Sequence, residues 1–257
     1  MRYYVTSDIH CYFTLFREAL ADCGFFEDKA PHKLIICGDL FDRGREALEL
    51  QNFIVDLMEK DEVILIKGNH EDLMMEPISE WKSEVYFQPF NVTNGTTETV
   101  LQLTKSSLDD LDYRSDLVYE KLLETPYIKK ILPAMRDYFE TDHYIFTHGW
   151  IPCFSERGSY GKKYGSYNKN WRNSDSKAWA EARWINGMEA AYSGIIEENK
   201  TIVCGHWHSS FGHSRYENDG EEFGESANFN PYYGKGIIAI DACTAYSGQV
   251  NCIVLED

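Results

Sequence analysis

Short, continuous apolar runs recur along the chain and are separated by polar stretches. Seven of these runs have the length and composition of strands that are covered on both faces. They are Tyr3–Ser7, Leu34–Cys37, Val63–Ile66, Tyr144–Thr147, Thr201–Cys204, Ile237–Ile240 and Val250–Leu255. The runs predict a buried sheet that other layers cover.

Between the first three runs, apolar residues recur at helical spacing. One set, at intervals of three and four, would form one face of an amphipathic helix: Leu50, Phe53, Ile54, Leu57 and Met58. An earlier set follows Thr14, which we expect to cap its helix: Leu15, Phe16, Ala19 and Leu20. The order strand, helix, strand, helix, strand predicts an α/β fold.

The alternation of strands and helices lapses between residues 77 and 142. Within this stretch, Leu117–Leu123 and Ile128–Phe139 have helical patterns, and Pro126 and Pro133 interrupt them. We therefore expect a helical insertion at about 77–142 in the α/β fold.

Two later stretches have the composition of loops. Residues 156–184 combine glycine, serine, asparagine and lysine with many aromatic side chains. This stretch is either a surface loop that buried aromatics hold in place, or a rim that shapes substrate entry. The second loop, Glu217–Tyr233, interrupts the late sheet. No repeat or linker composition is present, so we expect a single domain over residues 1–257.

Composition narrows the classes of protein. The chain has 257 residues, of which 43% are hydrophobic, so it can bury a core without disulfides. Its formal net charge of −17 argues against long contacts with nucleic acid or an anionic membrane, since both depend on Lys and Arg. No apolar run approaches the roughly 20 residues that a membrane span needs.

The cysteines and the N-terminus indicate the compartment. The 7 cysteines form an odd number and lack a CxxC pair, which is typical of reduced thiols. The first residues, MRYYVTSD, lead directly into a predicted strand without the apolar core of a signal peptide. We therefore expect a cytoplasmic protein that does not act at a membrane.

Five of the seven predicted strands end in residues of types that bind metals. In chain order the motifs are Ser7-Asp8-Ile9-His10, Gly38-Asp39-Leu40-Phe41-Asp42-Arg43-Gly44, Gly68-Asn69-His70-Glu71, Thr147-His148-Gly149 and Gly205-His206-Trp207-His208. Each motif alone could be turn chemistry, but turn chemistry does not explain the recurrence at five strand ends. Open α/β sheets bind ligands at the carboxyl ends of their strands, so the motifs predict one shared site.

The residue types favour two metal ions. Aspartate, histidine and asparagine without thiolate ligands suit Mn²⁺, with Fe, Zn, Ni or Co as alternatives. The candidate ligands are too many for one ion, and a central aspartate could bridge two ions about 3.5–4 Å apart. Such a pair clamps the attacking and leaving oxygens of a phosphoryl displacement.

In this order, the five motifs resemble those of the calcineurin-like metallophosphoesterases. GDLFDRG and GNHE are similar to the phosphoprotein phosphatase branch, as is the late stretch IDACTAYSGQVNCIVLE. The resemblance runs from Ser7 to Leu255, although no motif covers residues 77–142 or 156–182. It implies a four-layer α/β/β/α sandwich with a dinuclear metal site at the carboxyl edge of the strands.

The resemblance also implies a role for each matching residue. The metal ligands would be Asp8, His10, Asp39, Asn69, His148 and His206, with Asp39 as the carboxylate that bridges the two ions. A water between the two ions would lose its proton near neutral pH and act as the nucleophile. His70 would stay off the metals and protonate the leaving oxygen, and Asp42 would orient it. Arg43 would bind the phosphate through bidentate hydrogen bonds. Glu71 is expected to support the turn and the start of the following helix.

Two residues have open alternatives. Arg183 lies between the fourth and fifth motifs, where related phosphatases carry a second phosphate-binding arginine; otherwise it is a helix-surface arginine packed beside Trp184. The GHWH motif contains a second histidine, His208, where the phosphatase branch has one. His208 would be a further metal ligand, as in phosphodiesterase and nuclease members, or an exposed loop residue.

The main expectation is a metal-dependent phosphomonoesterase of the serine/threonine phosphoprotein phosphatase type. A dinucleoside polyphosphate hydrolase, similar to diadenosine tetraphosphatase, is the alternative, because aromatics within residues 160–184 could stack a base. Because of the GHWH motif, a phosphodiesterase or nuclease is a further alternative. A binding protein with an inactive site is disfavoured, since the catalytic residues that the resemblance implies are all present.

Overall fold

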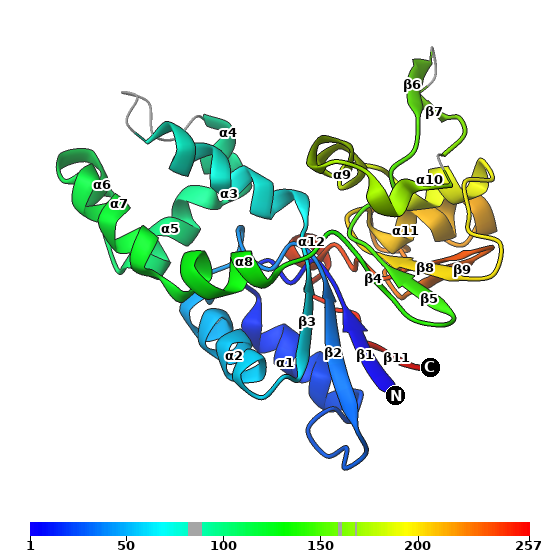
Figure 1. The fold of residues 1–257 in the computed structure, drawn as a ribbon, viewed down its shortest axis with the longest axis horizontal. Coiled ribbons are helices and arrows are strands. Elements are labelled where there is room, and N and C mark those ends of the chain that lie inside the picture. The colour runs from blue at the N-terminus through cyan, green and yellow to red at the C-terminus, as the bar shows by residue number, and fades with distance from the viewer. Residues whose placement is uncertain (82–88, 159–160, 168) are drawn as a thin grey trace.

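Two sheets form the centre of the computed structural model, which describes residues 1–81, 89–158, 161–167 and 169–257 (Figure 1). The first sheet contains, in spatial order, β11 (Ile253–Glu256), β1 (Arg2–Thr6), β2 (His32–Cys37) and β3 (Val63–Ile66). The second contains β4 (Phe139–Glu140), β5 (Tyr144–Phe146), β8 (Thr201–Cys204), β10 (Ile237–Ala239) and β9 (Tyr232–Gly234).

The inner strands of each sheet are parallel. β1, β2 and β3 run in one direction in the first sheet. β5, β8 and β10 do so in the second sheet. The remaining strands, β11, β4 and β9, add antiparallel edges. The loops that follow the parallel strands therefore leave each sheet at the same edge, which is where the sequence motifs lie.

Three apolar clusters separate the layers of the fold. Successive strand residues point to opposite faces, so each of the inner, parallel strands contributes to two clusters. The cluster between the sheets includes Val5, Ile35, Ile64, Phe146, Val203 and Ile238. On the outer face of the first sheet, Tyr4, Leu34 and Ile36 pack against α1 (Phe13–Asp22) and α2 (Ala47–Glu59). On the outer face of the second, Ile145, Ile202 and Ala239 pack against α9 (Ser176–Ala182) and α10 (Gly187–Tyr192). The four-layer α/β/β/α fold is thus confirmed.

Helices occupy the stretch between β3 and β4. They are α3 (Asn69–Glu80), α4 (Pro89–Asn94), α5 (Thr96–Thr104), α6 (Leu108–Tyr113), α7 (Ser115–Glu124), the π-helix η1 (Tyr127–Ile131) and α8 (Leu132–Ala134). Figure 1 shows this group on one side of the first sheet and α9 and α10 on the other. Val100 and Val118 belong to the same apolar cluster as Leu50 of α2, so these helices extend the first core.

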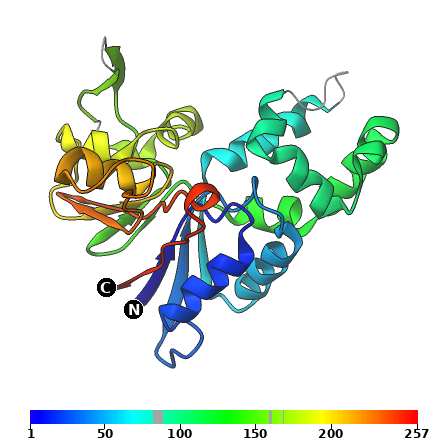
Figure 2. The same cartoon turned by 180° about the vertical axis from the view of Figure 1, so that it is seen from behind.

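Short helices complete the chain in the second half. They are η2 (Trp171–Asn173), α11 (Ser209–Gly212), η3 (His213–Glu217) and α12 (Thr244–Ser247). The two termini lie side by side, at the end of the first sheet away from α12 (Figures 1 and 2). In the described part of the chain, no helix combines the length and apolarity that crossing a membrane would require. The described residues also form no disulfide.

The expectation that Thr14 caps its helix is wrong. Helix α1 begins at Phe13, so Thr14 lies in its first turn. The amide nitrogen of Thr14 donates to Glu46 Oε2 at 3.0 Å, and its hydroxyl donates to Glu46 Oε1. A carboxylate from the segment before α2 therefore satisfies an unpaired N–H group at the helix start, a contact that no local spacing reveals.

The helix expected over Ile128–Phe139 is wrong in its second half. The helical structure ends at Ala134, and Phe139 pairs with Phe146 in the antiparallel β4–β5 ladder. The expected loop Glu217–Tyr233 likewise ends in strand β9. Both errors concern short edge strands, whose few residues carry too little pattern for a sequence-based prediction.

The aromatic stretch 156–184 is only partly a loop. It contains most of the hairpin β6 (Ser155–Gly158) and β7 (Gly161–Tyr164), together with η2 and α9; residues 159, 160 and 168 lie outside the described residues. Trp171 and Trp179 are buried in the cluster under the second sheet. These two rings therefore hold the segment against the core, as the first of the two interpretations expects.

Candidate metal centre

Loops from the carboxyl ends of both sheets meet close to α12, near the centre of the view in Figure 2. The first sheet contributes Asp8 and His10 after β1, Asp39 and Asp42 after β2, and Asn69 and His70 after β3. The second sheet contributes His148 after β5 and His206 after β8. All but His206, which is half-buried, are almost completely buried, so the fold places an unusually polar cluster at the junction of the two sheets.

Asp39 belongs to two groups of atoms that could ligate metals. One group adds His10 and His70, the other adds His148 and His206, and the atoms of each group lie within 4.8 Å of one another. Asp39 Oδ2 is 3.7 Å from His10 Nε2, and Asp39 Oδ1 is 3.3 Å from His148 Nε2. The two carboxylate oxygens thus face two different groups, which is the position that a bridging ligand needs.

The ring orientations of His10 and His148 fit bound cations. Nδ1 of His148 is 2.8 Å from the Cys37 carbonyl oxygen, and Nδ1 of His10 is 2.9 Å from that of Phe41. Since a carbonyl oxygen only accepts hydrogen bonds, each Nδ1 carries a hydrogen and each Nε2 faces Asp39. Backbone carbonyls commonly orient metal-binding histidines in this way.

Asn69 completes the acceptor set around His148. Its Oδ1 lies 2.8 Å from His148 Nε2, which Asp39 also approaches. Burial opposes protonation, but Asp39 and Asp8 raise the pKa of His148 to about 10. The oxygen acceptors around His148 Nε2 are therefore stabilised by positive charge, and a divalent cation would provide it.

The backbone around the cluster is strained. Asp8, His10, Asp39 and His206 have left-handed φ angles of 51°, 50°, 54° and 66°. Such conformations cost about 1–3 kcal/mol each in non-glycine residues and concentrate at functional sites. At Gly205, an added Cβ would lie 2.1 Å from Asp8 Oδ2, so only glycine permits this approach of the two sheets.

Glu71 holds the turns that carry the ligands. Its carboxylate accepts hydrogen bonds from the amides of Asp39 at 3.1 Å, Leu40 at 3.0 Å and Gly68 at 2.7 Å. Burial raises the pKa of Glu71 to about 7, with Asp39 adding to the effect. Glu71 therefore ties the loop after β2 to the start of α3, the supporting role expected from the sequence.

His70, Asp42 and Arg43 form a connected group beside the cluster. His70 Nδ1 lies 2.8 Å from Asp42 Oδ2, and its Nε2 lies 3.2 Å from a guanidinium nitrogen of Arg43. Burial opposes protonation of His70, but Asp39 and Asp42 together raise its pKa. Asp42 is buried and Arg43 is exposed, so the group extends from the interior to the surface.

The structure pairs Arg183 and His208 with carboxylates, and Arg183 is buried rather than on a helix surface. The buried Arg183 donates to Asp72 Oδ2 at 2.9 Å and to Asp137 Oδ1 at 3.1 Å. His208 Nε2 lies 2.9 Å from Glu222 Oε1. Phosphate binding by Arg183 and metal binding by His208 stay predictions.

Sequence reasoning missed two residues of the site, Thr96 and Thr99 of α5. Their hydroxyls hydrogen-bond to Asp42, at 2.9 Å in each case. The stretch GTTETV carries polar residues on a helix that packs into the core, which was the available signal. Threonine is too common in helices and turns for that signal to point to Asp42.

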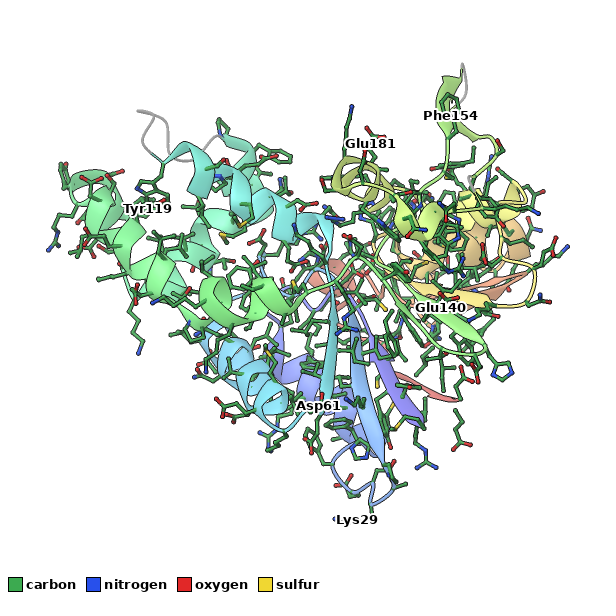
Figure 3. All side chains as sticks on the ribbon, in the orientation of Figure 1. Lys29, Asp61, Tyr119, Glu140, Phe154 and Glu181 are labelled. Atoms are coloured by element: carbon green, nitrogen blue, oxygen red, sulfur yellow. The ribbon has the colours of Figure 1, made fainter. Side chains whose placement is uncertain are left out.

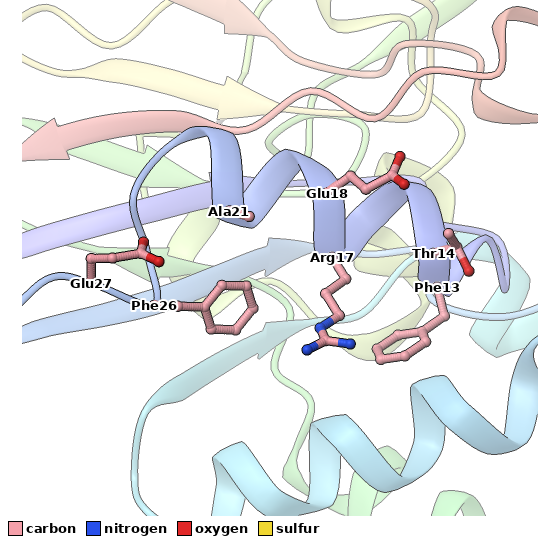
Figure 4. Close-up of a pocket in the computed structure, with 7 residues that line it drawn as sticks. All are labelled: Phe13, Thr14, Arg17, Glu18, Ala21, Phe26 and Glu27. Carbon is pink, nitrogen blue, oxygen red and sulfur yellow. The ribbon is translucent and has the colours of Figure 1, made fainter.

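A pocket of about 500 Å³ lies elsewhere, beside α1 (Figure 4). Phe13, Arg17 and Phe26 are among its lining residues, and none of the residues of the metal cluster lines it. The converging ligand types, rather than this pocket, identify the candidate site.

Comparison with known sequences shows the family of the chain. The family model described as calcineurin-like phosphoesterase matches residues 1–234. A symmetrical bis(5'-nucleosyl)-tetraphosphatase from Buchnera aphidicola subsp. Acyrthosiphon pisum is 31% identical over 121 residues. That match covers 46% of this chain and 43% of the relative, so the chain spans less than half the length of the curated relative it matches.

Solved structures share the fold at low sequence identity. A cold-active protein-tyrosine phosphatase from a psychrophilic Shewanella species has a TM-score of 0.55 and 16% identity, over 100% of this chain and 75% of that one. A candidate diadenosine tetraphosphatase has a TM-score of 0.50 and 14% identity, over 99% of this chain and 89% of that one. At these identities the likeness concerns the fold alone.

Proposed function

Because the chain belongs to the calcineurin-like phosphoesterase family, we propose that it is a metal-dependent phosphoester hydrolase. The observation that carries the proposal is the His70–Asp42 pair beside the two ligand groups that share Asp39. A buried carboxylate behind an imidazole, next to a cluster of metal-ligand types, suits proton transfer to the leaving oxygen of a phosphate ester.

In this proposal Asp39 and five neighbouring side chains would hold two divalent ions, with Mn²⁺ preferred over Fe, Zn, Ni or Co. The five are Asp8, His10, Asn69, His148 and His206. When bound, the ions would supply Lewis-acid catalysis and a water nucleophile at neutral pH. The acceptor atoms that converge on His148 Nε2 support this role of the site.

The remaining residues act on the substrate. Asp42 accepts the Nδ1 hydrogen of His70, so the opposite nitrogen, Nε2, is the one that would give a proton to the leaving oxygen. Nε2 lies 3.2 Å from Arg43, which only donates, so Nε2 must first take up that proton. Arg43 is exposed beside Nε2, and its planar guanidinium can donate two hydrogen bonds to phosphate oxygens. These positions would bring the phosphate and the proton donor together.

The substrate class that we propose is a phosphomonoester of the phosphoserine or phosphothreonine type. The motif GDLFDRG, with Arg43 beside His70, supports this class. A dinucleoside polyphosphate is the second candidate, because the curated relative is named as a bis(5'-nucleosyl)-tetraphosphatase. A phosphodiester is the third, because GHWH carries the second histidine, His208.

A panel of substrates tests the proposal. Purified protein with added Mn²⁺ would be assayed on an aryl phosphate, a phosphopeptide, diadenosine tetraphosphate, a cyclic nucleotide and a bis-aryl diester. We expect turnover of the aryl phosphate and the phosphopeptide, and an increased KM for both after Arg43→Ala, since Arg43 would bind the monoester dianion.

The same panel can overturn the proposal. Faster turnover of diadenosine tetraphosphate than of any monoester would show that the substrate class is a dinucleoside polyphosphate, the second candidate. An equal effect of Arg43→Ala on monoester and diester would remove the argument for a monoesterase. No turnover of any substrate by metal-loaded protein would favour a binding protein.

A further inference from the structure

Helix α5 presents one face to the loop that carries Asp42 and Arg43. Thr96, Thr99 and Gln102 recur at intervals of three along α5, so they lie on the same side of the helix. Gln102 donates to the Gly44 carbonyl oxygen at 3.0 Å and accepts from the Ala47 amide at 3.0 Å. The helix thus binds the backbone of the segment after β2 at two points beyond Arg43.

The two threonines bind Asp42 itself. Thr99 Oγ1 accepts a hydrogen bond from the Asp42 amide at 3.0 Å and donates to Asp42 Oδ1 at 2.9 Å. Thr96 Oγ1 donates to Asp42 Oδ2 at 2.9 Å. The same oxygen accepts a hydrogen bond from His70 Nδ1 at 2.8 Å. Both carboxylate oxygens are therefore held by α5, and the rotation of Asp42 is restricted.

The backbone at this contact is strained and closely packed. Asp42 and Arg43 both have left-handed φ angles, of 74° and 66°, an unusual pair for successive non-glycine residues. A Cβ added to Gly95, just before α5, would lie 2.1 Å from the backbone nitrogen of Arg43. The start of α5 thus lies directly against the strained segment and has the contacts needed to hold it.

We propose that α5 is a positioning element of the active site, in which Thr96 and Thr99 orient Asp42 and, through it, His70. This inference rests on the proposed function of His70 as proton donor. In the described part of the chain, the Thr96 and Thr99 hydroxyls hydrogen-bond to Asp42, so the two threonines would act through it. Helix α5 then supports the active site as well as extending the core.

Neighbouring Thr97 provides a matched control. It lies on the same helix and is buried, but its hydroxyl has no hydrogen-bond partner among the described residues. Replacement of each threonine by valine keeps the shape of the side chain and exchanges the hydroxyl for a methyl group. A comparison of Thr96→Val and Thr99→Val with Thr97→Val therefore isolates the hydrogen bonds to Asp42 from a general effect of altering α5.

The experiment uses two phosphate esters that differ in the need for a proton donor. An alkoxide leaving group requires protonation, whereas 4-nitrophenolate leaves without it. We expect the combined Thr96→Val and Thr99→Val variant to lose about 10–100-fold in kcat on an alkyl phosphate, as for other supporting partners of site residues. Its kcat on 4-nitrophenyl phosphate, its KM values and its bound metal should be close to those of the wild type.

Controls separate positioning from general destabilisation. Thr99→Ser keeps the hydroxyl and should retain activity on the alkyl phosphate, and Thr97→Val should leave both rates unchanged. An equal loss on both esters, or loss of metal, would make the threonines merely structural and overturn the inference. So would unchanged turnover of the alkyl phosphate.

A second readout does not depend on catalysis. In proton NMR, the hydrogen-bonded Nδ1–H of His70 should give a low-field signal that is absent in His70→Asn. We expect the signal in wild type and Thr97→Val, and its loss or broadening when Thr96 and Thr99 are both valine. Persistence of the sharp signal in the variant with both valines would overturn the inference. If the signals behave as expected but the wild type hydrolyses no phosphate ester, only the proposed function is contradicted.

Discussion

At the scale of single residues, adjacent positions in the motif Gly68-Asn69-His70-Glu71 have different surroundings. Asn69 points its amide oxygen at His148, across the junction of the two sheets. His70 directs Nδ1 to Asp42, while Glu71 accepts hydrogen bonds from three backbone amides. Asn69, His70 and Glu71 are therefore a candidate ligand, a candidate acid and a support.

The role of His70 leads to a prediction for His70→Asn. We expect turnover of an alkyl phosphate to fall by about 10²–10⁴-fold, the usual contribution of general acid catalysis, with unchanged metal content. Kinetics on that ester and metal analysis of the purified variant would test this. Because His70 Nε2 also lies 4.0 Å from Asp39 Oδ2, loss of one metal in the variant would instead identify His70 as a ligand.

At the scale of secondary-structure elements, charged side chains attach short segments to the second sheet. Glu140 on β4, labelled in Figure 3, accepts from Arg172 Nε at 2.7 Å and pairs with Lys200 Nζ at 2.9 Å. The Arg172 guanidinium lies over the Trp171 ring, 4.3 Å from its centroid. β4 has only two residues, so these contacts connect η2 and the segment before β8 to an otherwise weak edge.

The Glu140 cluster predicts how stability depends on pH. Hydrogen bonds from Arg172 lower the pKa of Glu140 to about 2, so ionised Glu140 stabilises the folded protein above its unfolded pKa of about 4.3, and this contribution is lost as pH falls toward 2. We expect Glu140→Gln to lower the free energy of unfolding by about 1–2 kcal/mol at pH 7 and by less at pH 3. Urea unfolding at both pH values would measure the difference.

A matched control for that experiment is Glu59→Gln. Glu59 pairs with Lys130 at 3.3 Å, but both side chains are exposed, so little change is expected at either pH. A difference between Glu140→Gln and wild type that stays constant from pH 7 to pH 3 would contradict the assignment of the charge effect to Glu140.

At the scale of the whole molecule, the candidate metal centre joins the two sheets. His148, from the second sheet, lies against Cys37, Asp39 and Asn69 of the first. The His206 amide, also from the second sheet, donates to Asp8 Oδ2 at 3.0 Å. Ions held here would link the sheets to each other, so metal binding should act on global stability.

Metal binding should therefore raise the melting temperature of the whole protein. At a Mn²⁺ concentration about 100 times the dissociation constant, the expected stabilisation is about 2.7 kcal/mol, or roughly 5–10 °C for a chain of this size. Thermal unfolding with and without Mn²⁺, after removal of metal by a chelator, would measure it.

Asp39→Asn tests whether one carboxylate serves both ligand groups. We expect this variant to lose metal binding, activity and the thermal shift together, because Asp39 faces both groups. An Asp39→Asn variant that still binds two ions per chain would refute the bridging role.

The sequence alone determined the fold class and the set of candidate ligands. Buried strands carry continuous apolar runs, and the carboxyl ends of parallel strands must lie at one edge, so motifs such as SDIH and GNHE were bound to converge. His10 and Asp39 could be placed together for this reason, whereas the approach of His148 to Asp39 depends on how the second sheet packs against the first.

Only the tertiary structure decided which partner each polar side chain takes. Glu46 at the start of α1, the carboxylates around Arg183, and Thr96 and Thr99 on Asp42 all join segments far apart in the sequence. Such contacts depend on the paths of loops and on the docking of helices, which leave no periodic pattern in the chain. Periodicity reports the face that a residue occupies, whereas a hydrogen-bond partner is set by how those faces meet.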